Sequence, residues 1–231
     1  MPKLYLTGGA VRDKLLGLPV KDYDFCCEAS SFEEMKQLVI SKGWDIKVER
    51  PEFVTLRAVC PKLGGVDVVL CRRDGIYSDG RRPDSVSIGS LRDDLSRRDF
   101  TTGAIAQDVE TGQFIDPFNG IEDCNDRILR CVGKSEERMA EDSLRLLRAI
   151  RLSVTKSFEI HWNIEDLLRT QRVVNLLDNI SAERVYDELV KMFKFDTVKS
   201  LAALEEYPLI KNYVFDKEKF GIWLMPSLKK S

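Results

Sequence analysis

Residues 4–25 read LYLTGGAVRDKLLGLPVKDYDF, and this stretch decides the fold. Its apolar start is typical of a buried strand. The pair Gly8 and Gly9 then leads into a short segment with the spacing of a helix, which ends at a Gly-Pro break. The chain next enters a second apolar strand through Asp22 and Asp24. We therefore expect a strand, a glycine turn, a helix and a strand in close succession.

The glycine pair and the aspartate pair together indicate a chemistry that neither pair indicates alone. A single Gly-Gly is usually a turn, and a single D-x-D usually lies in a solvated loop. On a strand, however, side chains alternate between faces, so Asp22 and Asp24 should emerge on the same face. A glycine pair at a helix start lets backbone N–H groups approach a phosphate. Together they predict a place for a triphosphate beside two carboxylates that hold Mg²⁺.

Composition narrows the class of protein. The 231 residues include 36 Lys and Arg against 38 Asp and Glu, so RNA binding would have to come from local groups of arginines. No apolar run is long enough to span a membrane, and the N-terminus does not resemble a signal peptide. Six cysteines without a C-x-x-C pair, and His161 as the only histidine, argue against a zinc site. We expect a cytoplasmic protein with reduced thiols.

The pattern of apolar residues changes near residue 133, which predicts an α+β first part and an all-helical second part. In the first part, helices are expected over 31–42 and 91–98, strands over 53–59, 66–70 and 128–132, and a loop over 74–83. In the second part, helical spacing covers 135–153, 163–179, 181–195 and 197–206. The α+β part should hold a small mixed β-sheet flanked by helices.

A third acid lies inside an apolar strand, Val66-Asp67-Val68-Val69-Leu70. A carboxylate buried there without a partner would be costly. We expect Asp67 either to share a metal with Asp22 and Asp24 or to face solvent.

Further motifs follow in order along the chain: DLSRRDF at 94–100, FIDPFNG at 114–120, EDSLRLLRAIR at 141–151 and SAERV at 181–185. With residues 4–25, this ordered set resembles the class II tRNA nucleotidyltransferases, which comprise CCA-adding enzymes and bacterial poly(A) polymerases. The resemblance extends from Leu4 to about Phe195. It implies a nucleotidyltransferase head over residues 1–133, a helical neck over 134–195 that recognises the base, and a short helical body remnant over 196–231.

The resemblance also implies roles for particular residues. Gly8, Gly9 and Arg12 would bind the triphosphate. Arg98, the second arginine of RRDF, would reach phosphate or ribose. The remaining implied roles are catalysis by Asp22, Asp24 and Asp67, metal binding by Asp22 and Asp24, and nucleotide binding along the first neck helix by Asp142, Arg145, Arg148 and Arg151.

The spacing of Asp142 and Arg145 makes physical sense by itself. Residues three apart are neighbours on a helix, and a carboxylate accepts hydrogen bonds where a guanidinium donates them. Such a pair fits the base edge of cytosine or adenine, which offers an amino donor beside a ring-nitrogen acceptor. Uracil and guanine would leave like groups facing each other, at about 1–3 kcal/mol per buried group. Alone, however, Arg145, Arg148 and Arg151 would also fit a solvated charged stripe.

We therefore expect a template-independent, Mg²⁺-dependent enzyme that uses CTP and ATP at the tRNA 3′ end, as a monomer or homodimer. Alternatives are an A-adding enzyme or poly(A) polymerase, a nucleotidyltransferase toxin acting on tRNA, and a silent RNA-binding relative. Glu49-Arg50-Pro51-Glu52-Phe53-Val54 stands where poly(A) polymerases of this family tend to have a Gly-Arg-Arg-Phe-like segment, which favours CCA addition.

The chain departs from the family pattern in three places. Gly103 stands where Asn is common, and Ser143 stands where Pro is common. The chain also has few residues after the fifth motif, so weak, oligomer-assisted or acceptor-end-limited RNA binding is expected.

Overall fold

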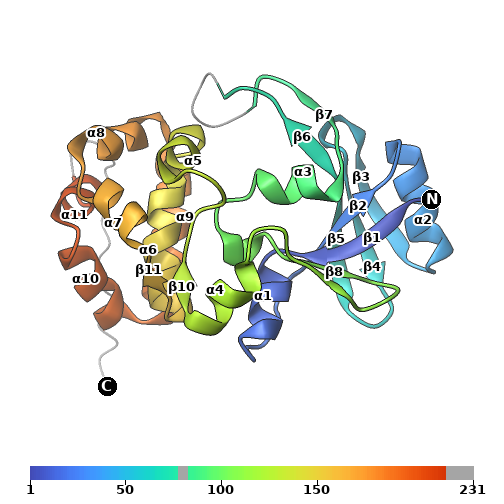
Figure 1. Cartoon of the computed structure of the whole chain (residues 1–231), viewed down its shortest axis with the longest axis horizontal. Coiled ribbons are helices and arrows are strands. Elements are labelled where there is room, and N and C mark those ends of the chain that lie inside the picture. Colours follow the sequence, from blue (N-terminus) through green and yellow to red (C-terminus); the bar gives the residue numbers. More distant parts are fainter. Residues whose placement is uncertain (78–82, 217–231) are drawn as a thin grey trace. The chain divides into compact units, whose positions relative to one another are not determined.

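A computed structural model of the chain describes residues 1–77 and 83–216. These residues divide into two compact units, 1–77 with 83–138, and 139–216. The first unit is α+β and the second is helical, as the change of pattern predicts (Figure 1). Within the described residues, none of the helices is both long enough and apolar enough to cross a membrane.

The first unit is built on a seven-stranded sheet with the order β3-β4-β5-β2-β1-β8-β9. Its only parallel pair in the described residues is β2 with β5, and the other pairs are antiparallel. The strands are β1 (Lys3–Thr7), β2 (Tyr23–Glu28), β3 (Asp45–Arg50), β4 (Thr55–Cys60), β5 (Gly64–Leu70), β8 (Ala106–Asp108) and β9 (Phe114–Ile115). The mixed sheet is thus confirmed, although its β3, β8 and β9 were not expected from the sequence.

Helices cover both faces of this sheet (Figure 1). The helices of the unit are α1 (Gly9–Leu15), α2 (Phe32–Ser41), α3 (Leu91–Ser96) and α4 (Gly120–Asp126). Met35 and Val39 of α2 pack on one face against Phe25 and other residues of the sheet. Leu91 and Leu95 of α3 pack on the opposite face against Tyr5 and Cys26. Because side chains alternate along β2, Asp24 shares the α3 face with Cys26.

Short elements complete the first unit. They are β6 (Arg72–Asp74) and β7 (Val86–Ile88), which pair antiparallel, and β10 (Ile128–Leu129). Part of the loop expected over 74–83 falls on residues 78–82, which lie outside the described residues. All six cysteines are buried, so they pack as the small hydrophobes that the sequence predicts.

The second unit is a group of helices. After α5 (Ser135–Glu141), which begins before the boundary, come α6 (Leu144–Lys156), β11 (Glu159–Ile160), α7 (Trp162–Leu168), α8 (Gln171–Val174), α9 (Ala182–Phe195), α10 (Thr197–Glu205) and α11 (Pro208–Val214). Helix α6 packs against α9. Both helices carry buried apolar residues, among them Ile150 and Leu189. The helices expected over 181–195 and 197–206 are confirmed as α9 and α10.

The single helix expected over 135–153 is wrong, because the chain breaks at Asp142 and Ser143 between α5 and α6. The Ser143 hydroxyl donates a 2.8 Å hydrogen bond to the carbonyl of Leu176, which ties the break to another segment of the unit. The segment 163–179 is likewise divided, into α7, α8 and a 3₁₀ turn at Asn175–Asn179.

Candidate active site

The glycine turn after β1 is shaped by contact with an arginine. Gly8 has φ of 69°, a backbone conformation that favours glycine. A Cβ atom at this position would lie 2.7 Å from Nη1 of Arg98. Gly8 is therefore needed both for the turn and for the close approach of this guanidinium.

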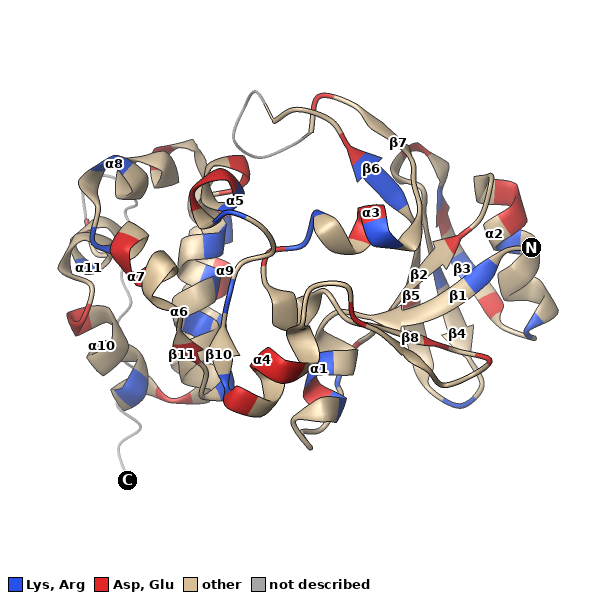
Figure 2. Ribbon diagram, viewed as in Figure 1, with Lys and Arg blue, Asp and Glu red and all other residues tan. Residues whose placement is uncertain are grey.

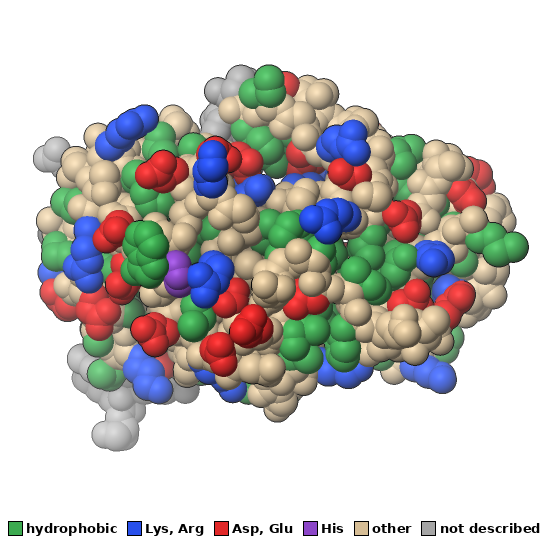
Figure 3. Space-filling view, in the orientation of Figure 1, with side chains coloured by type: hydrophobic (Ala, Val, Ile, Leu, Met, Phe, Trp, Pro, Cys, Tyr) green, Lys and Arg blue, Asp and Glu red, His purple; other side chains and the backbone are tan. Residues whose placement is uncertain are grey.

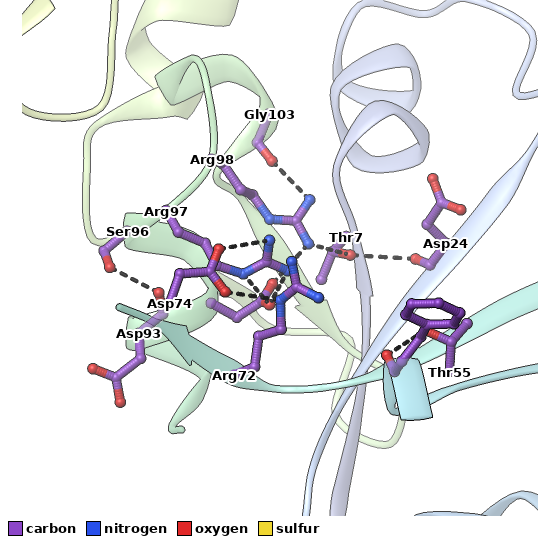
Figure 4. A network of polar contacts seen from close by, with 12 residues as sticks. Thr7, Asp24, Thr55, Arg72, Asp74, Asp93, Ser96, Arg97, Arg98 and Gly103 are labelled. Atoms are coloured by element: carbon purple, nitrogen blue, oxygen red, sulfur yellow. Dashed lines mark hydrogen bonds and ion pairs between the residues drawn. The ribbon is translucent and has the colours of Figure 1, made fainter. Parts of the chain in front are cut away.

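Arg98 is held by three different segments of the first unit (Figure 4). Its Nη2 donates to Oγ1 of Thr7 at 2.9 Å and to Oδ2 of Asp94 at 3.1 Å, and its Nη1 donates to the carbonyl of Gly103 at 3.2 Å. Its buried Nε has no hydrogen-bond partner among the described residues. The guanidinium is thus fixed beside the glycine turn.

The predicted carboxylates lie close to this arginine on the sheet. Asp24 and Asp67 are register partners on the parallel strands β2 and β5. Thr7 links Arg98 to this place, because its hydroxyl also contacts the backbone carbonyl of Asp24 at 3.4 Å. Asp22 lies one residue before β2.

Neighbouring charges affect the pKa of Asp24. Loss of solvation and the negative charges of Asp67 and Asp22 raise the pKa of Asp24, while the positive charge of Arg98 opposes the rise. Asp24 nevertheless stays exposed. A carboxylate that is crowded by like charges and still accessible suits a cation with hard oxygen ligands.

Asp67 is not buried as the strand pattern suggests. Its side chain is 44% exposed, and its Oδ1 lies 3.7 Å from Nε of Arg57. In the described part of the chain, no three acidic, histidine or cysteine side chains form a group able to hold a metal ion. The side chain of Asp67 thus lies beside Arg57, and its negative charge also acts on Asp24.

Arg12 lies beside the second glycine of the turn, because a Cβ atom at Gly9 would lie 3.3 Å from its Nη2. Its Nε and Nη2 contact Oδ1 of the adjacent Asp13 at 2.9 and 2.8 Å. The side chain is only 13% exposed. Its contact with a triphosphate stays a prediction, and the pair with Asp13 leaves the N–H groups of Nη1 as further donors.

A buried ionic cluster lies next to Arg98, and it was not singled out in the sequence. Asp94, on α3, contacts Arg97 at 2.5 Å as well as Arg98. Asp74, on β6, contacts Arg72 at 3.0 Å and Arg97 at 3.7 Å. The spacing of Asp94 three and four residues before the two arginines is the signal that could have shown the first half of this cluster.

In the second unit, Asp142 and Arg145 do not lie on one helix as expected. Asp142 precedes α6, and its carboxylate accepts two hydrogen bonds from Arg184, at 2.7 and 3.3 Å. Arg145 is the second residue of α6, is 8% exposed, and contacts Glu141 at 2.7 Å. The two residues stay close along the chain, because the amide of Arg145 donates to the carbonyl of Asp142 at 3.1 Å.

The other two arginines of α6 share one partner on α9. Glu188 is 4% exposed, forms an ion pair with Arg151, and lies 3.8 Å from Nη1 of Arg148. Figure 2 shows basic residues along α6. Arg145 and Arg151 are thus paired and largely buried, so a solvated stripe does not describe them.

The single histidine, His161, contacts a polar and an aromatic neighbour. Nδ1 of His161 lies 2.7 Å from Oδ1 of Asn163, and the imidazole ring lies 5.4 Å from the ring of Trp162. Its purple side chain is visible on the surface in Figure 3. The candidate site therefore consists of carboxylates, arginines and a glycine turn.

Two family models match the chain. One is described as the poly A polymerase head domain and matches residues 4–130. The other is described as a probable RNA and SrmB-binding site of polymerase A and matches residues 157–214. The first match covers more than half of the sequence.

Individual proteins agree with these matches. The CCA-adding enzyme of Streptococcus uberis is 40% identical over 190 residues, which is 82% of this chain and 45% of that protein. The crystal structure of the Bacillus stearothermophilus CCA-adding enzyme in complex with CTP superposes with a TM-score of 0.76 and 34% identity, over 90% of this chain and 49% of that one.

A tRNA nucleotidyltransferase complexed with a primer tRNA and an incoming ATP analog superposes with a TM-score of 0.77 and 30% identity, over 93% of this chain and 60% of that one. The chain thus spans about half the length of the relatives that it matches.

Proposed function

This chain belongs to the poly A polymerase head-domain family, and we propose that it is a template-independent nucleotidyltransferase that builds or repairs the CCA end of tRNA from CTP and ATP. The observation that supports this most strongly is the placement of Asp24 and Arg98. The carboxylate of Asp24 is accessible and lies near other negative charges. It is on the same face of the sheet as Arg98, whose guanidinium is fixed against the glycine turn. A nucleoside triphosphate and a metal ion need both kinds of group.

We propose that Asp22 and Asp24 would hold Mg²⁺. The fit rests on their oxygen donors and on the repulsion that raises the pKa of Asp24. Mg²⁺ commonly binds one or two carboxylates and completes its coordination with water and substrate phosphates, so a third protein acid is not required. When bound, it would activate the attacking hydroxyl and stabilise the pyrophosphate leaving group.

The arginine has a separate task. Arg98 would attract and orient the phosphates of the incoming nucleotide, since a guanidinium matches phosphate oxygens geometrically. Its position beside Asp24 would place those phosphates near the metal-binding acids. Gly8 permits this approach, because any side chain there would meet the guanidinium.

Base choice is proposed to depend on Asp142 and Arg145. Arg184 anchors the acceptor and Glu141 anchors the donor, so each keeps a fixed orientation. An acceptor beside a donor matches the amino group and ring nitrogen of cytosine and adenine and mismatches those of uracil and guanine. The break before α6 changes the expected geometry but keeps the two residues adjacent.

Two further candidate functions would use the same site and give other products. An A-adding enzyme or poly(A) polymerase would use the same acids, and the sequence at residues 49–54 argues against the second. A toxin that modifies a different tRNA end would also keep them. We place the reaction in the cytoplasm, because the six cysteines, all within the described residues, are buried free thiols.

One experiment separates these possibilities. Transcripts of a tRNA that end before the CCA, after the first C, or after both C residues are incubated with Mg²⁺ and each labelled NTP. CCA addition predicts CMP on the first two primers, AMP on the third, and a stop after the terminal A. AMP on the third primer alone indicates an A-adding enzyme, and long A tails indicate a poly(A) polymerase. No incorporation into any primer refutes the proposal.

A further inference from the structure

Asp94 is a buried carboxylate that contacts both Arg97 and Arg98. Its residue is 1% exposed. A buried carboxylate is costly unless it is paired. Both of its oxygens are used: Oδ1 accepts from Arg97 at 2.5 and 2.9 Å, and Oδ2 accepts from Arg98 at 3.1 Å.

We propose that Asp94 is a positioning residue for nucleotide transfer, whose buried carboxylate fixes the Arg98 guanidinium against the Gly8 turn. The inference rests on the proposed function, because it concerns how this chain prepares Arg98 for phosphate. Of the three groups that hold Arg98, the hydroxyl of Thr7 and the carbonyl of Gly103 are neutral. Asp94 supplies the only hydrogen bond in that set in which both partners are charged, which is the strongest kind.

The carboxylate itself is kept in place from the other side. Arg97, which shares Asp94, is also near Asp74, at 3.7 Å. Asp74 has a side chain that is 3% exposed, contacts Arg72 at 3.0 Å, and accepts a hydrogen bond from the hydroxyl of Tyr77 at 2.7 Å. Asp94 therefore cannot move together with Arg98 unless its ion pair with Arg97 breaks or Arg97 leaves Asp74.

The charges of the cluster suit an anionic ligand. It contains three guanidinium groups, of Arg72, Arg97 and Arg98, against the carboxylates of Asp74 and Asp94. The three arginines therefore share one positive charge that the two carboxylates do not balance. Among the three, Arg98 is the one whose charge acts on Asp24. Pairing with Asp94 thus fixes the guanidinium and leaves net positive charge in the cluster.

Helix formation does not explain Asp94. The N-terminus of α3 is capped by Ser90 together with Asp93, which also forms an ion pair with Arg73 at 3.0 Å. Asp93 thus supports the helix, and the adjacent Asp94 holds the arginines. The two residues offer a matched comparison of the same side chain on the same helix.

The test is a double-mutant cycle on Asp94 and Arg98 with kcat and KM measured for CTP on a tRNA lacking its CCA end. Asp94→Asn keeps the size and removes the charge, and we expect kcat/KM to fall at least about tenfold, which corresponds to about 1.4 kcal/mol. Asp93→Asn should stay within about twofold of wild type even though it removes the negative charge that pairs with Arg73. In an Arg98→Ala background, Asp94→Asn should change kcat/KM by less than about twofold.

Multiplicative losses in the double variant would overturn the proposal, as would an unchanged kcat/KM for Asp94→Asn. If Asp94→Asn does not fold, Asp94→Glu keeps the buried charge and shifts its position, and the same non-additivity with Arg98→Ala is expected. If wild type transfers no nucleotide, the proposed function fails, and the cycle is repeated on the Kd for CTP. If the Kd values show no coupling between Asp94 and Arg98, or if wild type does not bind CTP, the positioning role is overturned as well.

Discussion

Replacing Asp24 with asparagine should make the metal-free protein more stable while it removes the proposed activity. The stability gain follows from the crowding of negative charge around this residue. Loss of solvation and the charges of Asp67 and Asp22 raise its pKa, and Arg98 opposes only part of the rise. Above its folded-state pKa, Asp24 is therefore ionised at a cost to the folded state, and asparagine avoids that cost.

The expected gain in stability is small because Asp24 is exposed. As register partners on adjacent strands, Asp24 and Asp67 have Cα atoms about 5 Å apart. Two like charges at about 5 Å in a water-like dielectric repel by about 0.8 kcal/mol. The attraction of Arg98, lost in the same substitution, reduces the net gain to about 0.3–0.8 kcal/mol. For a chain of this size, that corresponds to an increase in Tm of about 1–3 °C.

The pH dependence of the free energy of unfolding gives the sign of the contribution of Asp24. A raised folded-state pKa means that the protonated form favours folding, so wild type keeps this stability below the unfolded pKa and loses it as pH rises through the folded pKa. The advantage of Asp24→Asn should therefore be present at neutral pH and vanish below about pH 4.

Thermal unfolding with EDTA and with excess Mg²⁺ provides the assay. Mg²⁺ should raise the Tm of wild type and have a smaller effect on Asp24→Asn, because only the native site binds it. Asp45→Asn is the control, since Asp45 is exposed and ion-paired with Lys47, and it should give no gain. A lower Tm for Asp24→Asn at neutral pH without metal would refute the reasoning.

The other predictions concern base choice, the glycine turn and the helical unit. Asp142→Ala or Arg145→Ala should relax discrimination against UTP and GTP, so kcat/KM for all four nucleotides is measured; an equal loss for every nucleotide would contradict the role. Gly8→Ala and Gly17→Ala should each lose about 1–2 kcal/mol of unfolding free energy because both glycines have positive φ, but only Gly8→Ala should also lose nucleotide incorporation. Glu188→Gln, which leaves buried arginines with a neutral partner, should cost about 3 kcal/mol in urea unfolding; a loss below about 1 kcal/mol would argue against a stabilising role.

Local patterns predicted the framework of the site. The apolar strands and the glycine pair in residues 4–25 predicted β1, α1 and β2 in order. They also led to the expectation that Asp22 and Asp24 lie near a phosphate-binding turn. The prediction of these three elements succeeds because strand alternation and glycine turns depend on neighbouring residues.

Features that depend on distant residues were not predictable in this way. The break at Ser143 is tied to the Leu176 carbonyl, and no local pattern showed that Asp142 would pair with Arg184, 42 residues away. Asp67 looked buried because its neighbours are aliphatic, yet alternation turns them inward and leaves the acid half-exposed beside Arg57. Helical spacing likewise could not show which arginine meets which acid.

The central claim is that Asp22 and Asp24 hold the metal for nucleotide transfer, and CMP incorporation into a tRNA lacking its CCA end tests it most directly. Wild type, Asp22→Asn, Asp24→Asn and the control Asp45→Asn are compared over a Mg²⁺ titration, with folding checked by circular dichroism. The account predicts that the control matches wild type and that both site variants, although folded, lose at least about a thousandfold in kcat, or about 4 kcal/mol. A folded Asp22→Asn or Asp24→Asn within about tenfold of wild type at saturating Mg²⁺ would contradict it.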